Sequence, residues 1–171
     1  MRYLVFSDTH GHTEFLDKWL GRHHKAVDGL VSAGDFYRDG QRLAEAFHLP
    51  YFGAQGNNDH EPGSPWHTTW VVEGIPIGVI HSHQWAAPER VVKLEEWAHQ
   101  QGCRMVIFGH SHVRLYRPGP ITLLNPGALF RPRNQEPKTC AMLTIEPTQT
   151  DPFAVEWILA DRDYFGIPKP T

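Results

Sequence analysis

The sequence repeats one local pattern five times: a short apolar stretch that ends directly in residues able to bind a metal ion. Each stretch has the length and composition of a buried β-strand. Ligands of α/β proteins bind beyond the carboxyl ends of the strands, where the following loops meet. The pattern therefore predicts an α/β fold with a single polar site on one rim. The five polar segments are Ser7-Asp8-Thr9-His10, Gly34-Asp35, Gly56-Asn57-Asn58-Asp59, His81-Ser82-His83 and Gly109-His110-Ser111-His112.

Strand and helix patterns alternate through the first third of the chain. This alternation predicts parallel strands joined by right-handed crossovers. The first helix has Thr13 as its expected N-cap. The predicted strands are 2–7, 29–33 and 51–54, and the predicted helices are 13–23 and 41–47.

The rest of the chain adds mostly strands. A hairpin is predicted about Gly74, followed by a helix that has Pro88 near its first turn and Gly102 as its C-cap. We expect two packed sheets, because one sheet would accommodate this many strands poorly. The predicted strands are 70–73, 75–81, 105–108, 115–117, 121–125, 140–145 and 153–159.

Length and charge limit the protein class. A chain of 171 residues without repeats or linker-like tracts predicts one domain, residues 1–171. Lys and Arg number 16 against 19 Asp and Glu, so no global positive field favours a stable complex with nucleic acid or a membrane. No apolar stretch approaches the ~20 residues of a membrane span. No secretory signal pattern opens the sequence, and two distant cysteines fit a reducing compartment, so we expect a cytoplasmic protein.

The strand ends supply oxygen and imidazole ligands but no thiolate. One such residue after a strand is more often a turn former or a helix cap than a metal ligand. Five such loops, in a chain with 12 histidines, instead indicate a metal site, and the donors exceed what one tetrahedral ion uses. Two adjacent divalent ions are therefore predicted, and with them phosphoester hydrolysis. The candidate ligands are Asp8, His10, Asp35, Asn57, His81, His110 and His112.

In this order the motifs resemble the D-x-H, G-D, G-N-x-D, H and G-H-x-H series of the calcineurin-like metallophosphoesterases. The later Asn125-Pro126-Gly127 segment resembles the N-P-G turn of the small YfcE-type phosphodiesterases. The resemblance covers most of the chain. It implies a four-layer α/β/β/α sandwich with two mixed sheets and a dimetal site at the strand ends.

The resemblance also implies how the ligands are shared, with Asp35 bridging two ions. It favours Mn²⁺, while Ni²⁺, Co²⁺, Fe or Zn²⁺ suit the same ligands. A hydroxide between the ions is expected to attack phosphorus in line. One ion takes Asp8, His10, Asp35 and His112, and the other takes Asp35, Asn57, His81 and His110.

The chain departs from many members of this family at Asn58, where they have a histidine thought to protonate the leaving group. Asparagine cannot act as a general acid near neutral pH, although its amide can donate a hydrogen bond to a phosphoryl oxygen. We therefore expect diesters or anhydrides with good leaving groups as substrates. His12, His60 and His83 lie beside the motifs and are alternative acids, or else supporting or solvated residues.

A basic stretch follows the last metal motif, with no Asp or Glu between residues 98 and 135. Guanidinium forks suit phosphate, so Arg131 or Arg133 is expected to bind the distal part of the substrate, unless both are simply solvated. Arg38 is a weaker candidate, because its surroundings resemble a protein phosphatase motif with Arg and Asp in reversed order. Trp66, Trp70 and Trp85 either stack a base or belong to the core or to an interface.

The prediction from the sequence is a metal-dependent phosphodiesterase acting on a small phosphorylated substrate, with a nucleotide among the candidates. One alternative is a non-catalytic interaction scaffold, as the retromer subunit of this fold illustrates. Another is a nucleotide or protein phosphatase. Complete donors at all seven ligand positions favour an enzyme. Homo-oligomer formation stays open.

Overall fold

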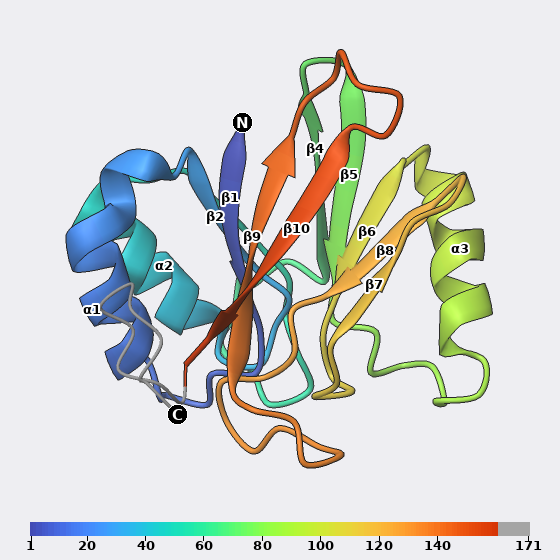
Figure 1. Cartoon of the computed structure of the whole chain (residues 1–171). Helices are drawn as coiled ribbons and strands as arrows, with labels where there is room; N and C mark the ends of the chain where they lie inside the picture. The colour runs from blue at the N-terminus through green and yellow to red at the C-terminus, as the bar shows by residue number, and fades with distance from the viewer. Residues whose placement is uncertain (161–171) are drawn as a thin grey trace.

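The computed structural model describes residues 1–160; residues 161–171 of the predicted single domain lie outside this range. Within it, the strands form two five-stranded sheets that pack face to face, with helices on the two outer sides (Figure 1). None of the helices in the described part is long and apolar enough to cross a bilayer.

The first sheet has the strand order β10-β9-β1-β2-β3. Strands β1, β2 and β3 are parallel, as the alternation of strands and helices predicted. Strands β9 and β10 extend the sheet in antiparallel fashion from β1. Its strands are β1 (Arg2–Phe6), β2 (Gly29–Ser32), β3 (Tyr51–Gly53), β9 (Thr139–Ile145) and β10 (Phe153–Leu159).

The second sheet has the order β4-β5-β6-β8-β7. Strands β5, β6 and β8 are parallel, and antiparallel β4 and β7 form the two edges. The predicted hairpin joins β4 to β5 through Glu73 and Gly74, whose φ angles of 47° and 88° are those of a two-residue turn with both residues left-handed. Its strands are β4 (His67–Val72), β5 (Ile75–Ile80), β6 (Met105–Phe108), β7 (Leu115–Arg117) and β8 (Thr122–Asn125).

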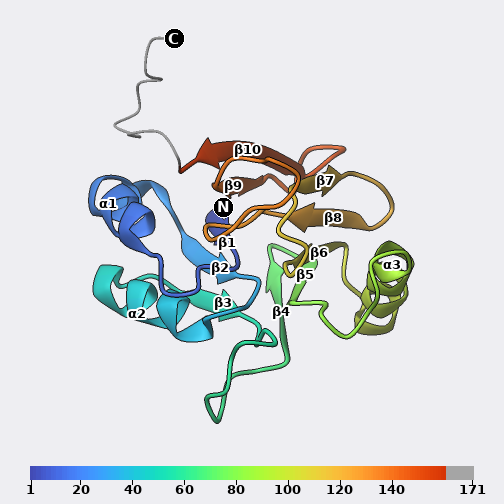
Figure 2. The ribbon, with the colours of Figure 1, turned by 90° about the horizontal axis from the view of Figure 1, so that it is seen from below.

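Helices cover the outer face of each sheet (Figures 1 and 2). Helices α1 (Glu14–His23) and α2 (Tyr37–Phe47) lie on the first sheet, and α3 (Arg90–Gln101) lies on the second. A short 3₁₀ turn, His24–Ala26, follows α1. The predicted four-layer α/β/β/α sandwich is therefore confirmed.

Successive side chains of a strand point to opposite faces of its sheet, and this alternation builds a core on each face. In β1, Tyr3 and Val5 enter the core between the two sheets, whereas Leu4 and Phe6 enter the core beneath α1 and α2. All four side chains are buried because both faces of this strand are covered. The period of two residues thus assigns each side chain to one of two cores.

Two helix starts differ from the prediction. Helix α2 begins at Tyr37 rather than residue 41, because the Asp59 carboxylate accepts a hydrogen bond (2.7 Å) from the backbone N–H of Tyr37. Thr13 occupies the N-cap position of α1 but makes no capping bond. Its hydroxyl donates to Asp17 (2.9 Å) and accepts from Arg42 (2.8 Å).

Truncating the core between the sheets should destabilise the protein. Ile107 is fully buried there, so Ile107→Ala is expected to lower the free energy of unfolding by about 2–5 kcal/mol. The control Val92→Ala changes a side chain on α3 that is 55% exposed, and it should stay within about 0.5 kcal/mol of wild type. Urea unfolding of metal-free protein measures both, and equal effects would contradict the layer assignment.

Candidate metal centre

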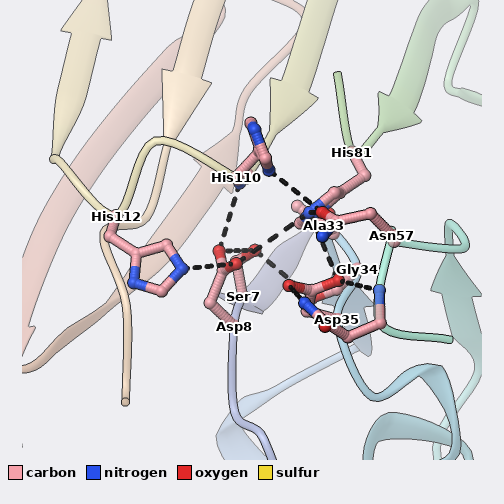
Figure 3. Close-up of polar contacts among 12 residues, drawn as sticks. Ser7, Asp8, Ala33, Gly34, Asp35, Asn57, His81, His110 and His112 are labelled. Carbon is pink, nitrogen blue, oxygen red and sulfur yellow. Dashed lines mark hydrogen bonds and ion pairs between the residues drawn. The ribbon is translucent and has the colours of Figure 1, made fainter. Parts of the chain in front are cut away.

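The structure brings all seven predicted donors to one place, where the loops after β1, β2, β3, β5 and β6 meet. Figure 3 labels these donors with the exception of His10. Four of them, Asp8, His10, Asp35 and His112, have ligand atoms that all lie within 4.8 Å of one another. These are the same four residues that the family resemblance assigned to one ion.

The other donors form a second group next to the first. The side-chain oxygen of Asn57 lies 3.2 Å from Nε2 of His81 and 3.1 Å from Nδ1 of His110. Asp35 contacts both groups, because its Oδ1 lies 3.4 Å from Nε2 of His81 and its Oδ2 lies 3.3 Å from Nε2 of His10. Asp35 thus occupies the position that a shared carboxylate would need.

Both aspartates are almost completely buried, with 0% exposure for Asp8 and 2% for Asp35. One oxygen of Asp8 accepts hydrogen bonds from the Ser7 hydroxyl (2.6 Å) and the His110 backbone N–H (3.2 Å). Its other oxygen, Oδ1, is buried without a regular hydrogen bond from the described residues. A buried carboxylate oxygen left in this way is expensive unless a cation compensates for its charge.

The histidine tautomers fit a bound cation. Nδ1 of His81 donates to the Ala33 carbonyl (2.7 Å), and Nδ1 of His112 donates to the Arg131 carbonyl (2.9 Å). In the neutral rings, Nε2 then carries a lone pair, which in His112 lies 3.0 Å from the orphaned Oδ1 of Asp8. Two acceptors cannot bond to one another, but both can bind the same cation. The donor set therefore fits a divalent ion with oxygen and nitrogen ligands.

Backbone strain concentrates on the same residues. A positive φ costs a residue with a side chain about 1–2 kcal/mol, and strain of this kind clusters at functional sites. Five of the seven donors have a positive φ angle. They are Asp8 (53°), His10 (46°), Asp35 (56°), His110 (67°) and His112 (59°).

Two glycines allow the loops to approach this closely. A Cβ on Gly56 would lie 2.1 Å from Oδ1 of Asp35 and 2.3 Å from the Asp35 backbone nitrogen. A Cβ on Gly34, where φ is +102°, would lie 2.6 Å from Nδ1 of His81. Only glycine fits at these contacts without displacing a donor.

Two aspartates outside the donor set hold its loops. Asp59 caps α2 and also accepts from the Gly56 N–H (2.7 Å), which fixes the loop of Asn57 on that helix. Asp39 accepts from the Thr9 hydroxyl and the Gly11 N–H, which flank His10. Asp59 was visible in its motif but carried no predicted role, and Asp39 appeared only as the aspartate of the reversed motif around Arg38, also without a predicted role.

Asn125, the residue of the predicted N-P-G turn, holds the last donor loop. Its amide nitrogen donates to the Gly109 carbonyl (3.1 Å) and the Ser111 hydroxyl (3.0 Å), between which lies His110. Its amide oxygen accepts from the Gly127 N–H (3.0 Å). Asn125 therefore fixes the backbone of the loop that carries His110 and His112.

Asn58, the predicted contact to a phosphoryl oxygen, donates both of its hydrogen bonds to Asp35. Its backbone N–H reaches Oδ1 (2.9 Å) and its side-chain amide reaches Oδ2 (2.7 Å). Asn58 also lines a pocket of about 330 Å³ over the donors, together with Phe130, Arg131 and Arg133. It thus holds a carboxylate while facing the pocket.

The other candidates lie at different distances from the donors. His83 packs its ring against those of His81 and His110, with centroids 5.5 and 6.2 Å apart. His12 is exposed and stacks on Phe130 at 4.5 Å. Arg38 is not among the pocket residues, because its guanidinium is mostly exposed and pairs with Glu61 at 3.3 Å.

The tryptophans are divided between surface and core. Trp66 is 46% exposed and packs edge-on against His83. Trp70 stacks on Phe52 beside the core between the sheets, and Trp85 packs against the core beneath α3. Trp70 and Trp85 therefore pack against the core, as one of the two predictions had it. Of the three tryptophans, Trp66 is the one with a largely exposed side chain, beside His83.

The neighbouring groups move the pKa values of two histidines in opposite directions. Burial, with the charges of His81 and Arg90, lowers the pKa of His110 to about 4. Contact with Asp8 raises the pKa of His112, despite burial. Burial acts to raise the pKa of Asp8, but contact with His112 and the charge of His81 outweigh it, and that pKa is lowered.

The chain is similar to phosphoesterases in sequence and fold. The family described as "Calcineurin-like phosphoesterase superfamily domain" matches residues 1–148. A Mycoplasma genitalium protein named "Probable metallophosphoesterase" is 30% identical over 162 residues, 88% of this chain and 92% of that protein. A crystal structure from Streptococcus pneumoniae, titled a predicted phosphoesterase, has a TM-score of 0.78 at 26% identity and covers 94% of this chain and 90% of its own. Vps29 of Entamoeba histolytica complexed with Zn²⁺ shares the fold, with a TM-score of 0.69, 19% identity and coverage of 94% and 99%.

Adding one methyl group at Gly56 should disrupt the centre. Gly56→Ala is expected to displace Asp35, weaken metal binding and lower the free energy of unfolding by about 1–3 kcal/mol. The control Gly21→Ala places its methyl in open space on α1 and should stabilise the protein by roughly 0.5–1 kcal/mol. Calorimetric titration with Mn²⁺ and urea unfolding measure both, and unchanged metal affinity in Gly56→Ala would contradict the packing described.

The metal-free protein should show the two shifted histidines in a titration followed by NMR. We expect His112 to titrate above its ordinary value of 6.5 and His110 near 4. Because metal ions bind the neutral ring, lowering the pH through the pKa of His112 should weaken metal binding first at that residue. A pKa of His110 above that of His112 would refute the assigned environments.

Proposed function

The chain belongs to the calcineurin-like phosphoesterase superfamily, and we propose that it is a phosphodiesterase that uses two divalent metal ions to hydrolyse a phosphodiester or a phosphoanhydride. The observation that carries this proposal is the position of Asp35, a buried carboxylate in contact with donors on both of its sides. A carboxylate with one such group on either side is what two adjacent ions require.

The proposed ligand sets follow the two groups of donors. Mn²⁺ is the favoured ion, and Ni²⁺, Co²⁺, Fe or Zn²⁺ suit the same oxygen and nitrogen ligands. When bound, the ions would lower the pKa of a water molecule and neutralise charge on the phosphoryl oxygens. One set is Asp8, His10, Asp35 and His112, and the other is Asp35, Asn57, His81 and His110.

The chain's own residues prepare this site before substrate binds. Asn58 holds both oxygens of Asp35, so the proposed bridge keeps its orientation. Its amide has no proton to give to a leaving group near neutral pH. We propose that substrates are restricted to those whose leaving group is stable without protonation, or that His12 or His83 supplies the proton.

The two histidines differ as proton donors. Burial lowers the pKa of His83, with the charge of His81 adding to the effect, so His83 carries little of the protonated form at neutral pH. His12 is exposed and stacks on Phe130, which lines the pocket. Because the lowered pKa disfavours the protonated form of His83, we propose His12 as the better candidate of the two.

A pocket of about 330 Å³ suits a small phosphorylated compound, which we propose as the substrate class, nucleotides included. We retain the cytoplasm as the proposed location, because Cys103 and Cys140 are buried free thiols.

A non-catalytic scaffold is the alternative, and it would not require two carboxylates buried among four imidazoles.

Replacing the proposed bridge separates enzyme from scaffold. Asp35→Asn should lower Mn²⁺-dependent hydrolysis of bis(p-nitrophenyl) phosphate at least about 100-fold, because losing a shared ligand affects both ions. The control Glu156→Gln removes an exposed carboxylate on β10 and should keep wild-type activity. Undiminished activity in Asp35→Asn would rule out the bridging role.

Asn58 predicts a substrate preference. With Mn²⁺, we expect a higher kcat/KM for bis(p-nitrophenyl) phosphate than for p-nitrophenyl phosphate, measured by release of p-nitrophenol at the same pH. Faster hydrolysis of the monoester would show that the diesterase assignment is wrong.

A further inference from the structure

The backbone of Phe36, the residue directly after Asp35, is left-handed. Its φ and ψ angles are 74° and 58°, and Gly34 and Asp35 before it also have positive φ angles, of 102° and 56°. An aromatic residue rarely adopts this conformation, because its Cβ crowds the backbone. Strain of this kind persists only where surrounding contacts enforce it, and it concentrates at functional sites.

Hydrogen bonds on both sides of Phe36 enforce this conformation. On one side, Asn58 donates to both carboxylate oxygens of Asp35. On the other side, the Tyr37 N–H donates to the Asp59 carboxylate (2.7 Å). The ring of Phe36 therefore projects from a backbone whose position is fixed.

The ring of Phe36 does not serve the interior of the protein. The residue is 38% exposed, and it belongs to none of the three apolar cores formed by the described residues. Burial in a core thus does not account for its strained backbone. The ring lies instead beside the loop of His10, where a Cβ built on Gly11 would be 3.8 Å from its Cε1.

His10 connects Phe36 to the metal donors. Nε2 of His10 lies 3.3 Å from Oδ2 of Asp35, and the centroid of its ring lies 5.4 Å from that of Phe36 and 5.3 Å from that of Phe130. Both His10 and Phe130 line the pocket over the donors. One imidazole ring thus separates the ring of Phe36 from the carboxylate of Asp35, a span that the sugar covers between the phosphate and the base of a nucleotide.

The pocket itself is polar and suits a phosphoryl group better than the organic part of a substrate. Phe130 is the apolar member of its lining, and the Phe130 ring is already in contact with His12 at 4.5 Å and with the Arg131 guanidinium at 4.9 Å. An aromatic group of the substrate therefore needs another ring, outside the pocket and next to it.

Two largely exposed rings, Phe36 and Trp66, lie near the donors. The ring of Phe36 neighbours the donor His10, whereas that of Trp66 neighbours His83, which is not among the pocket residues. Trp66 also lacks the positive φ angle that distinguishes Phe36. These observations favour Phe36 as the contact for substrate.

We propose that Phe36 stacks the base of a nucleotide whose scissile phosphate lies at the metal centre. This inference rests on the proposed function, because it places that phosphate among the donors. Every base has a π face, and stacking on an aromatic side chain contributes to affinity without selecting one base. Phe36 is thus a residue that selects nucleotides over other phosphodiesters.

A protein partner fits this surface less well than a base. A stable interface buries about 800 Å² on each side, with a cluster of apolar side chains at its centre. The other large apolar side chains that are exposed in the described chain belong to separate elements, since Val71 lies on β4 and Val92 on α3. A single ring beside a phosphate pocket matches one flat group.

Two phosphonates that differ only in the base test this role of Phe36. A thymidine 5′-methylenephosphonate cannot be hydrolysed, and its counterpart carries hydrogen in place of the base. Calorimetry with the Mn²⁺-loaded wild-type protein should give an affinity at least about fivefold higher for the thymidine compound, the lower end of what stacking of one base contributes. Equal affinities would overturn the proposal.

Variants at position 36 separate stacking from apolar contact. Phe36→Trp keeps an aromatic face and should keep the ratio of the two affinities. Phe36→Leu keeps an apolar side chain without that face and should reduce the ratio below about twofold. The control Trp66→Leu removes the exposed ring beside His83 and should keep the wild-type ratio. A wild-type ratio in Phe36→Leu would refute the proposal, whatever the result for Trp66→Leu.

The strained backbone provides a second test. Phe36 occupies the N-cap position of α2 without a capping bond from its side chain, and asparagine both tolerates a left-handed backbone and suits an N-cap. Phe36→Asn should therefore unfold at a higher urea concentration than wild type in metal-free buffer, while losing the affinity ratio. A lower urea midpoint would contradict the strain argument on which the assignment of Phe36 rests.

The outcome also separates this inference from the proposed function. If the wild-type protein hydrolyses bis(p-nitrophenyl) phosphate but binds the two phosphonates equally, only the role of Phe36 fails. If it distinguishes the phosphonates but hydrolyses no diester or anhydride with any of the divalent ions named above, the role of Phe36 stands and the phosphodiesterase assignment fails.

Discussion

The burial of two carboxylates at one point is the constraint on which the rest of the structure depends. Asp8 and Asp35 are almost inaccessible to water, and an uncompensated buried charge costs several kcal/mol. Compensation comes from a hydroxyl, backbone N–H groups and the amide of Asn58, and the imidazoles of His81 and His112 lie beside the two carboxylates. These groups belong to separate loops, so the site can form only where the carboxyl ends of strands from both sheets come together. The sandwich architecture supplies that meeting point, and positive φ angles at the donors are part of its cost.

Much of the fold and the donor set could be predicted from the sequence, for physical reasons. Apolar runs of strand length marked the strands, and the rule for strand ends placed Asp8, His81 and the others on one rim. What could not be predicted depends on partners far apart in sequence. Helix α2 begins early because Asp59 caps it across 22 residues, and Thr13 bonds to Arg42 across 29. Local patterns carry no information about such contacts.

Asn58 shows the same limit of sequence-based prediction at the site itself. The position of Asn58 beside the ligands suggested a contact with substrate, whereas its amide is used to hold Asp35. In the proposed centre, Asn58 would therefore orient the carboxylate of Asp35 rather than act as a general acid.

In the proposed centre, Asp35 lies between two metal ions. A crystal of the protein prepared with Mn²⁺, with data collected on both sides of the manganese absorption edge, locates the ions directly. Two anomalous peaks are expected, one on each side of Asp35, the first among Asp8, His10 and His112 and the second among Asn57, His81 and His110. A single peak, or peaks that Asp35 does not contact, would contradict it.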